Sequence, residues 1–268
     1  MLRPNPIEVE KIWGKESWVA STLPNGLQED LKAYVGGDYP LLVKTIQAEE
    51  ALAMQVHPDD EKAGLYEQSL GGTKCWYVLS ADEGSRIVYG LNGVYTASEL
   101  RMAVEAGNLA DCLRYVDVSA GDFIYLPAGT VHSFVGGMRL LEIRQASDVA
   151  YRLFDYERGR ECYVERAISC IKSDMVRNVT KAPGAFSCPY FTLEDISVED
   201  EYSGSADKAP SKRLPCDYNL LYVIEGSGTI NGESAGDGDL FVLEPGESFD
   251  VSGEFHLLKI IPAGPKHR

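Results

Sequence analysis

Three side chains able to ligate a metal ion occur in two short motifs. Gln55 and His57 lie in "AMQVHPDD", and His132 follows the Pro-Ala-Gly corner of "GDFIYLPAGTVHSF". On a strand, residues two apart point to the same face, so Gln55 and His57 are expected to project together. Imidazole is a frequent zinc ligand, and a zinc site needs about four ligands that converge. A single strand histidine is more often a packed residue, but the three together favour a metal site.

The overall charge limits the partners that the chain can bind. Its 268 residues carry a formal net charge of −16. This charge argues against nucleic acid and against an anionic membrane surface as partners. The N-terminus lacks the apolar stretch of a secretory signal, and no run of about 18 apolar residues predicts a membrane span. A negatively charged substrate therefore needs a local basic pocket that offsets the repulsion from the protein's overall negative charge. The sequence leaves the oligomeric state open.

The cysteines predict a reducing environment. Six cysteines are scattered along the chain without a Cys-x-x-Cys pair. In a chain of this size that pattern is typical of free thiols in the cytoplasm, not of a disulfide framework. It also argues against a structural zinc site made of cysteines.

Most of the chain has the pattern of short strands separated by glycine turns, which predicts an all-β protein with small helical inserts. The segment 39–58 is expected to form two strands around a short acidic turn, and the acids after His57 to form a solvated turn. Residues 75–91 are expected to form a hairpin around "ADEGS". The exception is a helical insert at about 96–114, which Thr96 or Ser98 would cap and Gly107 would interrupt.

An internal repeat indicates two similar β domains. "GDFIYLPAGTVHSF" at 121–134 aligns with "GDLFVLEPGESFDV" at 238–251. Both begin with a Gly-Asp turn and pass through a glycine corner, a pattern expected of two small jelly-roll barrels. We therefore expect a metal-binding barrel with the helical insert at 1–180 and a second barrel at 181–268. Phe249 or a neighbour stands where the first copy has His132, so only the first barrel is expected to carry chemistry.

The order of motifs resembles the type I phosphomannose isomerases in their short bacterial form, which belong to the cupin superfamily. The motifs stand here as "YPLLVKTIQAEEALAMQVHPDD", "LGGTKCWYVL", "GDFIYLPAGTVHSF" and "QASDVAYRLFDYER". The early "KIWGKESWVAS" resembles the family's opening segment, and the likeness covers roughly residues 10–160. It implies a zinc-dependent enzyme, with one zinc per chain, that interconverts mannose 6-phosphate and fructose 6-phosphate.

The resemblance also implies roles for individual residues. The zinc ligands of the family map onto Gln55, His57 and His132. A proton moves between C1 and C2 of the sugar through an enediol, which needs a base and a cation to steady the oxyanion. The residues that the resemblance assigns to catalysis are Arg152 and Glu142, and we expect Lys74 and Asp148 to bind the sugar phosphate.

One motif departs from the family. Where the family has Lys-x-Glu before the Trp-Tyr pair, this chain has Gly72-Thr73-Lys74, and Ala53 replaces a serine. The absent glutamate is a zinc ligand of the family, and a protonated lysine cannot ligate zinc. Either the metal keeps three protein ligands plus water, or it binds weakly, or catalysis is lost. We expect Lys74 to turn away from the metal toward the substrate. A cupin that binds a sugar or sugar phosphate without turnover is therefore the alternative to an isomerase.

Overall fold

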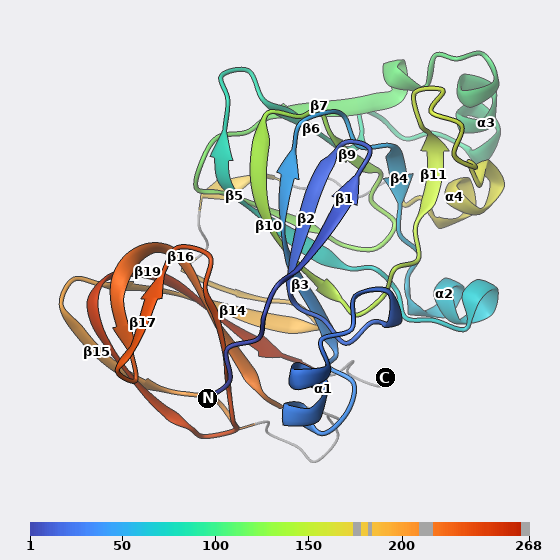
Figure 1. The fold of residues 1–268 in the computed structure, drawn as a ribbon. Helices are drawn as coiled ribbons and strands as arrows, with labels where there is room; N and C mark the ends of the chain where they lie inside the picture. The colour runs from blue at the N-terminus through green and yellow to red at the C-terminus, as the bar shows by residue number, and fades with distance from the viewer. Residues whose placement is uncertain (174–177, 182–183, 209–216, 264–268) are drawn as a thin grey trace. The chain divides into compact units, whose positions relative to one another are not determined.

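The structure is a computed structural model that describes residues 1–173, 178–181, 184–208 and 217–263. Strands dominate, and the helices are short, so the expectation of a mostly β protein with helical inserts is confirmed (Figure 1). The chain forms two compact units. Unit 1 consists of Met1–Ile7, Trp18–Leu42 and Ala182–Arg268, and unit 2 consists of Glu8–Ser17 and Val43–Lys181.

Two sheets build unit 2. The order of strands in the larger sheet is β1 (Ile7–Lys11), β2 (Gly14–Ala20), β3 (Leu41–Ala48), β10 (Met138–Gln145), β5 (Lys74–Ala81), β8 (Asp122–Leu126) and β12 (Thr180–Lys181). The order in the smaller sheet is β11 (Tyr151–Phe154), β4 (Met54–Val56), β9 (His132–Phe134), β6 (Arg86–Leu91) and β7 (Leu113–Asp117).

The hairpin expected at 75–91 is not formed. Both strands exist, but β5 pairs with β10 and β8 in the larger sheet, while β6 pairs with β9 and β7 in the smaller one. The "ADEGS" turn thus carries the chain from one sheet to the other. Local turn residues predicted where the strands end, but they could not predict the partner strands, because pairing is decided by the packing of the two sheets.

In the described part of unit 2, three α-helices accompany these sheets. The expected insert is confirmed: α3 (Ala97–Glu105) begins with a capping box of Thr96 and Glu99, and Gly107, at φ +74°, separates it from the 3-10 helix η2 (Leu109–Cys112). The acids after His57 do not form an open turn. Asp59 accepts a hydrogen bond from the Lys62 backbone and caps α2 (Asp60–Glu67). The remaining helix, α4 (Val164–Cys170), contacts α3 and β11.

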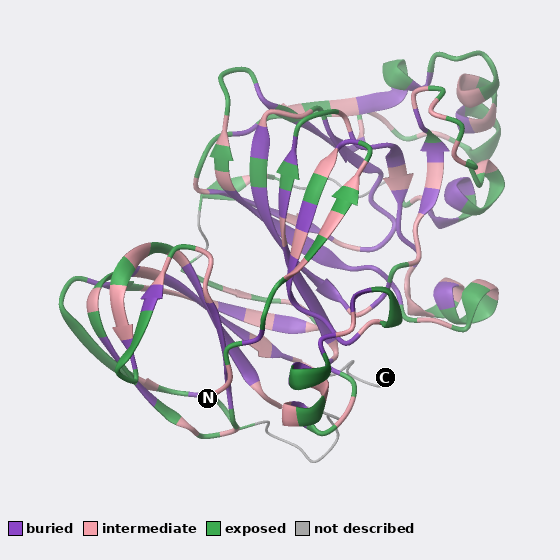
Figure 2. Cartoon of the chain, viewed as in Figure 1, coloured by how far each residue is buried: buried purple, intermediate pink, exposed green. Residues whose placement is uncertain are grey.

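Apolar clusters lie on both faces of the smaller sheet in the described part of unit 2. One is centred on Trp76, Ile124, Phe134 and Leu140, which come from both sheets. The other packs the opposite face of the smaller sheet, including Val56 and Leu153, against α3 and α4. Buried residues accordingly follow the strands, whereas the helices expose much of their surface (Figure 2). The first cluster therefore occupies the space that the two sheets enclose, on the face of the smaller sheet opposite α3 and α4.

Unit 1 is also built on a sheet. Its long strands β16 (Asn219–Ile230) and β19 (Ser248–Pro262) pair with each other. The apolar core of the unit includes Phe241 and Leu257. The remaining elements of the unit are β13 (Ala185–Ser187), β14 (Phe191–Val198), β15 (Glu201–Ser205), β17 (Glu233–Gly236), β18 (Leu240–Leu243), the 3-10 helix η1 (Pro24–Gly26) and α1 (Glu29–Val35).

The repeated motifs have the same local conformation in both units. Gly121 and Gly238 begin the two copies with φ angles of +82° and +85°. The aspartate after each glycine accepts a hydrogen bond from a backbone N–H three residues earlier, at 2.8 Å in the first copy and 2.9 Å in the second. The corner glycines, Gly129 and Gly246, also both have positive φ angles. The repeat seen in the sequence is therefore a repeat of backbone turns, which glycine alone adopts without strain.

Candidate functional site

The two histidines of the motifs stack against each other inside unit 2. His57 follows β4 and His132 begins β9, and their ring centroids lie 5.1 Å apart with 23° between the planes. Both side chains are buried. The Nδ1 atom of His57 lies 2.6 Å from the Val149 carbonyl, and that of His132 lies 2.9 Å from the Thr130 carbonyl. Because a carbonyl only accepts, each Nδ1 donates, and each Nε2 keeps a lone pair.

Neither lone pair has a partner among the residues that the structure describes. Nε2 of His57 and Nε2 of His132 are both buried without a hydrogen bond. Burial first, and then the charge of Lys74, lower the pKa of both imidazoles well below the ordinary value. Both rings are therefore neutral at physiological pH, which is the form that ligates a metal.

The register of the smaller sheet brings further motif residues beside His132. Gln55 lies directly opposite His132 on β9 and opposite Arg152 on β11. Cross-strand partners share a face, so Arg152, Gln55 and His132 form one row. Gln55 and Arg152 are partly exposed, and Arg152 donates through Nη1 to the Glu161 carbonyl at 3.4 Å. The row thus runs from a buried imidazole toward solvent.

A buried ion cluster lies on the larger sheet. Glu142 of β10 accepts hydrogen bonds at Oε2 from Lys74 at 2.9 Å and from the Trp76 indole at 2.6 Å. Its Oε1 lies 3.5 Å from Lys44 Nζ and 3.8 Å from Arg144 Nη1 and has no hydrogen-bond partner. Burial alone would raise the pKa of Glu142, but Lys74, Lys44 and Arg144 together hold it well below the ordinary value. Glu142 is therefore an anion enclosed by cations.

The pKa of Lys74 is lowered by its setting in this cluster. Its side chain is buried, and burial lowers its pKa to about 8 although Glu142 opposes the shift. The ammonium also lies 5.1 Å from the centre of the Trp76 ring, and that ring meets His132 edge-on at 5.5 Å. Trp76 thus joins the ion cluster to the histidine pair. The sequence alone did not predict that Lys74 pairs with Glu142.

Asp148 has a different setting. Its side chain is exposed, in the loop between β10 and β11. The same loop contributes the Val149 carbonyl that accepts from His57, and Ser147 Oγ, which donates to the Leu70 carbonyl at 2.8 Å. The "SDVAYR" motif therefore orients His57 through its backbone.

Two cations of the cluster, Lys44 and Arg144, were not predicted from the sequence. Glu142 and Arg144 are two apart on β10, so strand alternation places them on the same face. This spacing in "LLEIRQ" was the available signal. Lys44 of β3 forms ion pairs with Glu16 of β2 and with Glu142. No local sequence pattern predicts these pairs, because their members come from different strands.

A divalent metal fits the imidazole pair in part. Two neutral, buried Nε2 atoms without partners are suitable donors, and Gln55 adds an amide oxygen from the same row. Among the described residues, however, no group of three or more His, Cys, Asp and Glu side chains is placed to hold a metal ion. Lys74 adds a positive charge nearby. The donors thus suit a centre of two imidazoles and an amide, without a carboxylate ligand.

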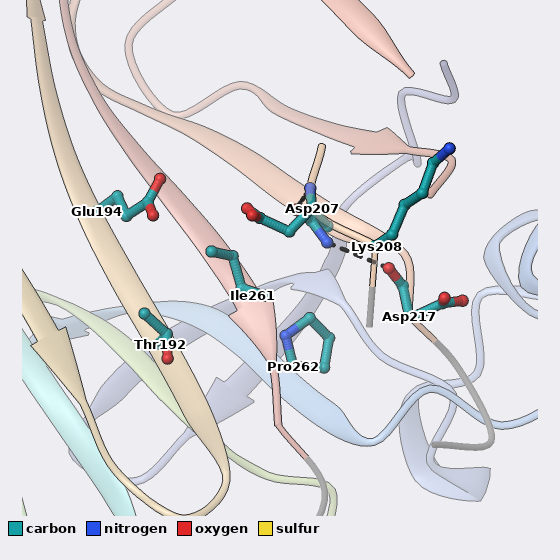
Figure 3. Close-up of a pocket in the computed structure, with 8 residues that line it drawn as sticks. Thr192, Glu194, Asp207, Lys208, Asp217, Ile261 and Pro262 are labelled. Atoms are coloured by element: carbon teal, nitrogen blue, oxygen red, sulfur yellow. Dashed lines mark hydrogen bonds between the residues drawn. The ribbon is translucent and has the colours of Figure 1, made fainter. Parts of the chain in front are cut away.

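Unit 1 has a pocket of its own, of about 260 Å³ (Figure 3). Its lining includes the carboxylates of Glu194, Asp207 and Asp217. Lys259 forms ion pairs with Glu194 and Asp207 and so neutralises part of this charge. None of the side chains predicted to act in chemistry lines this pocket.

Known proteins resemble the chain in sequence and in fold. No protein-family model matches it. It is 37% identical over 212 residues to the mannose-6-phosphate isomerase of Bacillus subtilis (strain 168), which covers 74% of this chain and 66% of that protein. It is 35% identical over 207 residues to the mannose-6-phosphate isomerase of Streptococcus mutans, which covers 72% and 63% respectively. The matched segments thus span just under two thirds of these relatives' lengths.

A solved structure extends the likeness to nearly the whole chain. The crystal structure of the mannose 6-phosphate isomerase from Bacillus subtilis superposes with a TM-score of 0.83 at 26% identity, covering 96% of this chain and 98% of that one. The fold, the motif order and the sequence are together those of a mostly β isomerase. The chain belongs to the mannose-6-phosphate isomerase family.

Proposed function

We propose that the protein interconverts mannose 6-phosphate and fructose 6-phosphate. The relatives are named for the isomerisation of mannose 6-phosphate. The observation that carries the proposal is the pair of neutral histidines, whose buried Nε2 atoms have no partner. Such atoms call for a ligand, because burying a polar group without a hydrogen bond costs about 1–3 kcal/mol.

We assign the proton transfer to Glu142. Its Oε2 is held by Lys74 and Trp76, whereas Oε1 keeps a free lone pair. The surrounding cations keep Glu142 ionised, so Oε1 is able to take the proton from one sugar carbon and return it to the other through an enediol. Arg152 steadies the oxyanion from the neighbouring row, since a guanidinium stays charged and donates in a fixed geometry. Lys74 and Asp148 are assigned to the sugar phosphate.

We propose one zinc per chain, held by Gln55, His57 and His132. A phosphomannose isomerase with zinc and yttrium bound shares the fold at 14% identity and a TM-score of 0.64. When bound, zinc polarises the sugar oxygens as a Lewis acid. The carbonyls of Val149 and Thr130 orient the two imidazoles, as the outer ligands of metal sites commonly do.

We also propose that the units are two jelly-roll barrels of the cupin type. The matching turns at 121–134 and 238–251 support this arrangement. In this scheme the barrel within 1–180, which corresponds to unit 2, carries the chemistry. The barrel of unit 1, which combines Ala182–Arg268 with Met1–Ile7 and Trp18–Leu42, packs without metal ligands. Phe249, at the position equivalent to His132, is buried in the core of unit 1.

The expected partner is a small sugar phosphate, and we propose a cytoplasmic location. Cys112, Cys162 and Cys170 are free thiols in the described part of the chain, which suits a reducing compartment. Within the same described part, no helix has the length and apolarity to cross a membrane.

A binding protein without turnover is the second candidate. The Lys74–Glu142 ion pair favours it, because the ammonium occupies one oxygen of the proposed base and lies near the proposed metal ligands. An assay that follows fructose 6-phosphate formed from mannose 6-phosphate separates the two candidates. We expect zinc-loaded protein to turn over and His132→Ala to lose turnover, while His256→Ala, in unit 1, stays active. Substrate binding by the wild type without turnover would establish the second candidate instead.

Metal content tests the zinc centre directly. We expect elemental analysis after zinc incubation to give about one ion per chain in the wild type and in His256→Ala, and far less in His57→Ala and His132→Ala. Absence of metal from the zinc-incubated wild type would contradict the centre.

A further inference from the structure

Buried polar atoms without partners gather around the histidine pair and the ion cluster. Across the described residues such atoms are few, and five of them belong to four side chains of this site: Nε2 of His57, Nε2 of His132, Oε1 of Glu142, and Nε and Nη2 of Arg144. Native proteins rarely leave buried polar groups unpaired, and a missing ligand is a common reason where they do.

These atoms divide into two chemical kinds. The imidazole nitrogens and the carboxylate oxygen are acceptors, which a metal ion or a hydroxyl hydrogen satisfies. The two nitrogens of Arg144 are donors only, and a metal ion cannot satisfy them. The proposed zinc centre therefore leaves Arg144 unexplained, and its N–H groups require oxygen acceptors.

The geometry of Arg144 restricts the acceptor further. Nε and Nη2 lie on one edge of the planar guanidinium, so their N–H groups point in parallel, while Nη1 on the other side lies 3.8 Å from Glu142. A parallel pair of N–H groups matches two oxygens held side by side, as in a carboxylate. Two oxygens on adjacent carbons of a cis-enediolate form a similar pair.

The local charge calls for an anion. The buried ion pairs of the cluster join three cations, Lys44, Lys74 and Arg144, to two carboxylates, Glu16 and Glu142. All five side chains are less than a tenth exposed. A fourth cation, Lys11, pairs with Glu16 from a partly exposed position. A buried positive charge without a matching anion is costly, so a negatively charged ligand at Arg144 would relieve that cost.

We propose that Arg144 is a further catalytic residue, whose Nε–Nη2 edge binds the paired oxygens of the enediolate. This inference rests on the proposed isomerase function. When the base removes the proton next to the sugar carbonyl, the C–H electrons form the C=C bond and the carbonyl π electrons move onto its oxygen. That oxygen becomes anionic and, with the neighbouring hydroxyl oxygen, accepts from Arg144. The proton returns to the other carbon, while the hydroxyl proton passes to the anionic oxygen and the hydroxyl oxygen becomes the new carbonyl. The step therefore consumes no oxidant or reductant.

A matched pair of ligands tests the proposal without turnover. Arabinonate 5-phosphate has a carboxylate that presents two anionic oxygens, and arabinitol 5-phosphate has a neutral CH2OH group in the same place. We expect titration calorimetry to show that the wild type binds the carboxylate compound at least about tenfold more tightly. Arg144→Gln should lose this preference and keep its zinc content. Arg139→Gln, at an exposed position on the same strand, should retain the preference.

The stability of the ligand-free protein gives a second readout. Because Arg144 is an incompletely paired buried cation, we expect Arg144→Gln to unfold at the same temperature or higher, whereas loss of a structural arginine would lower it. Arg144→Lys keeps the charge but loses the parallel N–H pair, so it should retain only part of the preference. If either Arg144→Gln or Arg144→Lys keeps the full preference, the proposal is wrong. A wild type that shows the preference but no isomerisation would overturn the proposed function alone.

Discussion

The backbone of Gly72 lies directly against the side chain of His57. A Cβ atom at residue 72 would lie 2.4 Å from Cβ of His57 and 2.9 Å from its Nδ1. Those distances are far inside van der Waals contact, so no side chain fits at residue 72 while His57 holds the Val149 carbonyl. This contact gives a physical reason for glycine at the position where the family motif has lysine.

Gly72→Ala should therefore destabilise the protein and displace His57. We expect a loss of about 1–3 kcal/mol in the free energy of unfolding, as for other overpacked sites, together with weaker metal binding. Gly64→Ala is a matched control, because a Cβ at this position of α2 meets nothing within 4 Å. It should add about 0.5–1 kcal/mol of stability. Denaturant unfolding and zinc titration measure both effects, and equal behaviour of the two variants would contradict the steric argument.

Local signals in the sequence predicted some elements of the fold and not others. The capping residue Thr96 and the interruption at Gly107 predicted α3 and η2, because caps and glycines act over a few residues. The partners of β5 and β6 were predicted wrongly, since they depend on how whole sheets pack. Helix α2 was taken for a turn, although Asp59 is a good capping residue.

The candidate site was likewise only partly predictable. Strand periodicity predicted that Gln55 and His57 share one face, but it could not show that the two histidine rings stack or that Nδ1 of each meets a carbonyl. The pairing of Lys74 with Glu142 joins residues 68 apart in sequence. Contacts over such separations follow from the register of β5 with β10, which no local pattern encodes.

Arg152→Ala should abolish isomerisation and leave the zinc content intact. The guanidinium belongs to the row of Gln55 and His132, and it stabilises charge without ligating metal. We expect turnover to fall by at least about a hundredfold, the scale seen when an oxyanion-stabilising donor is removed. Arg139→Ala, exposed on β10, should keep normal turnover. Near-normal activity in Arg152→Ala would contradict the assigned role.

Lys74→Glu should tighten metal binding and weaken binding of the sugar phosphate. The substitution removes a buried ammonium whose charge acts on both imidazoles, and it adds a carboxylate near them. Zinc affinity and mannose 6-phosphate affinity are measured separately by titration. Lys74→Gln is the control, because it removes the charge without adding a ligand, and it should tighten zinc less than glutamate does. Unchanged zinc affinity in both variants would mean that residue 74 does not act on the metal centre.

The buried ammonium of Lys74 should also make the stability of the metal-free protein depend on pH. Its pKa of about 8 in the folded chain is below the ordinary lysine value of 10.5, so between these values the unfolded chain binds more protons than the folded one. The free energy of unfolding contributed by this group therefore rises as the pH increases from 8 to 10.5, by at most about 1.4 kcal/mol per pH unit. Below pH 8 the full cost of burying the charge is present.

Comparison with Lys74→Met isolates this contribution, because the other titrating groups are common to both proteins. We expect the stability of the wild type, relative to Lys74→Met, to increase steadily when unfolding in denaturant is measured at successive pH values from 8 to 10. The slope of this difference is the decisive quantity, since methionine also changes packing near Glu142 and so shifts the difference by a constant. Parallel stability curves for the two proteins would show that Lys74 keeps an ordinary pKa and that its ammonium is better solvated than its burial beside Glu142 indicates.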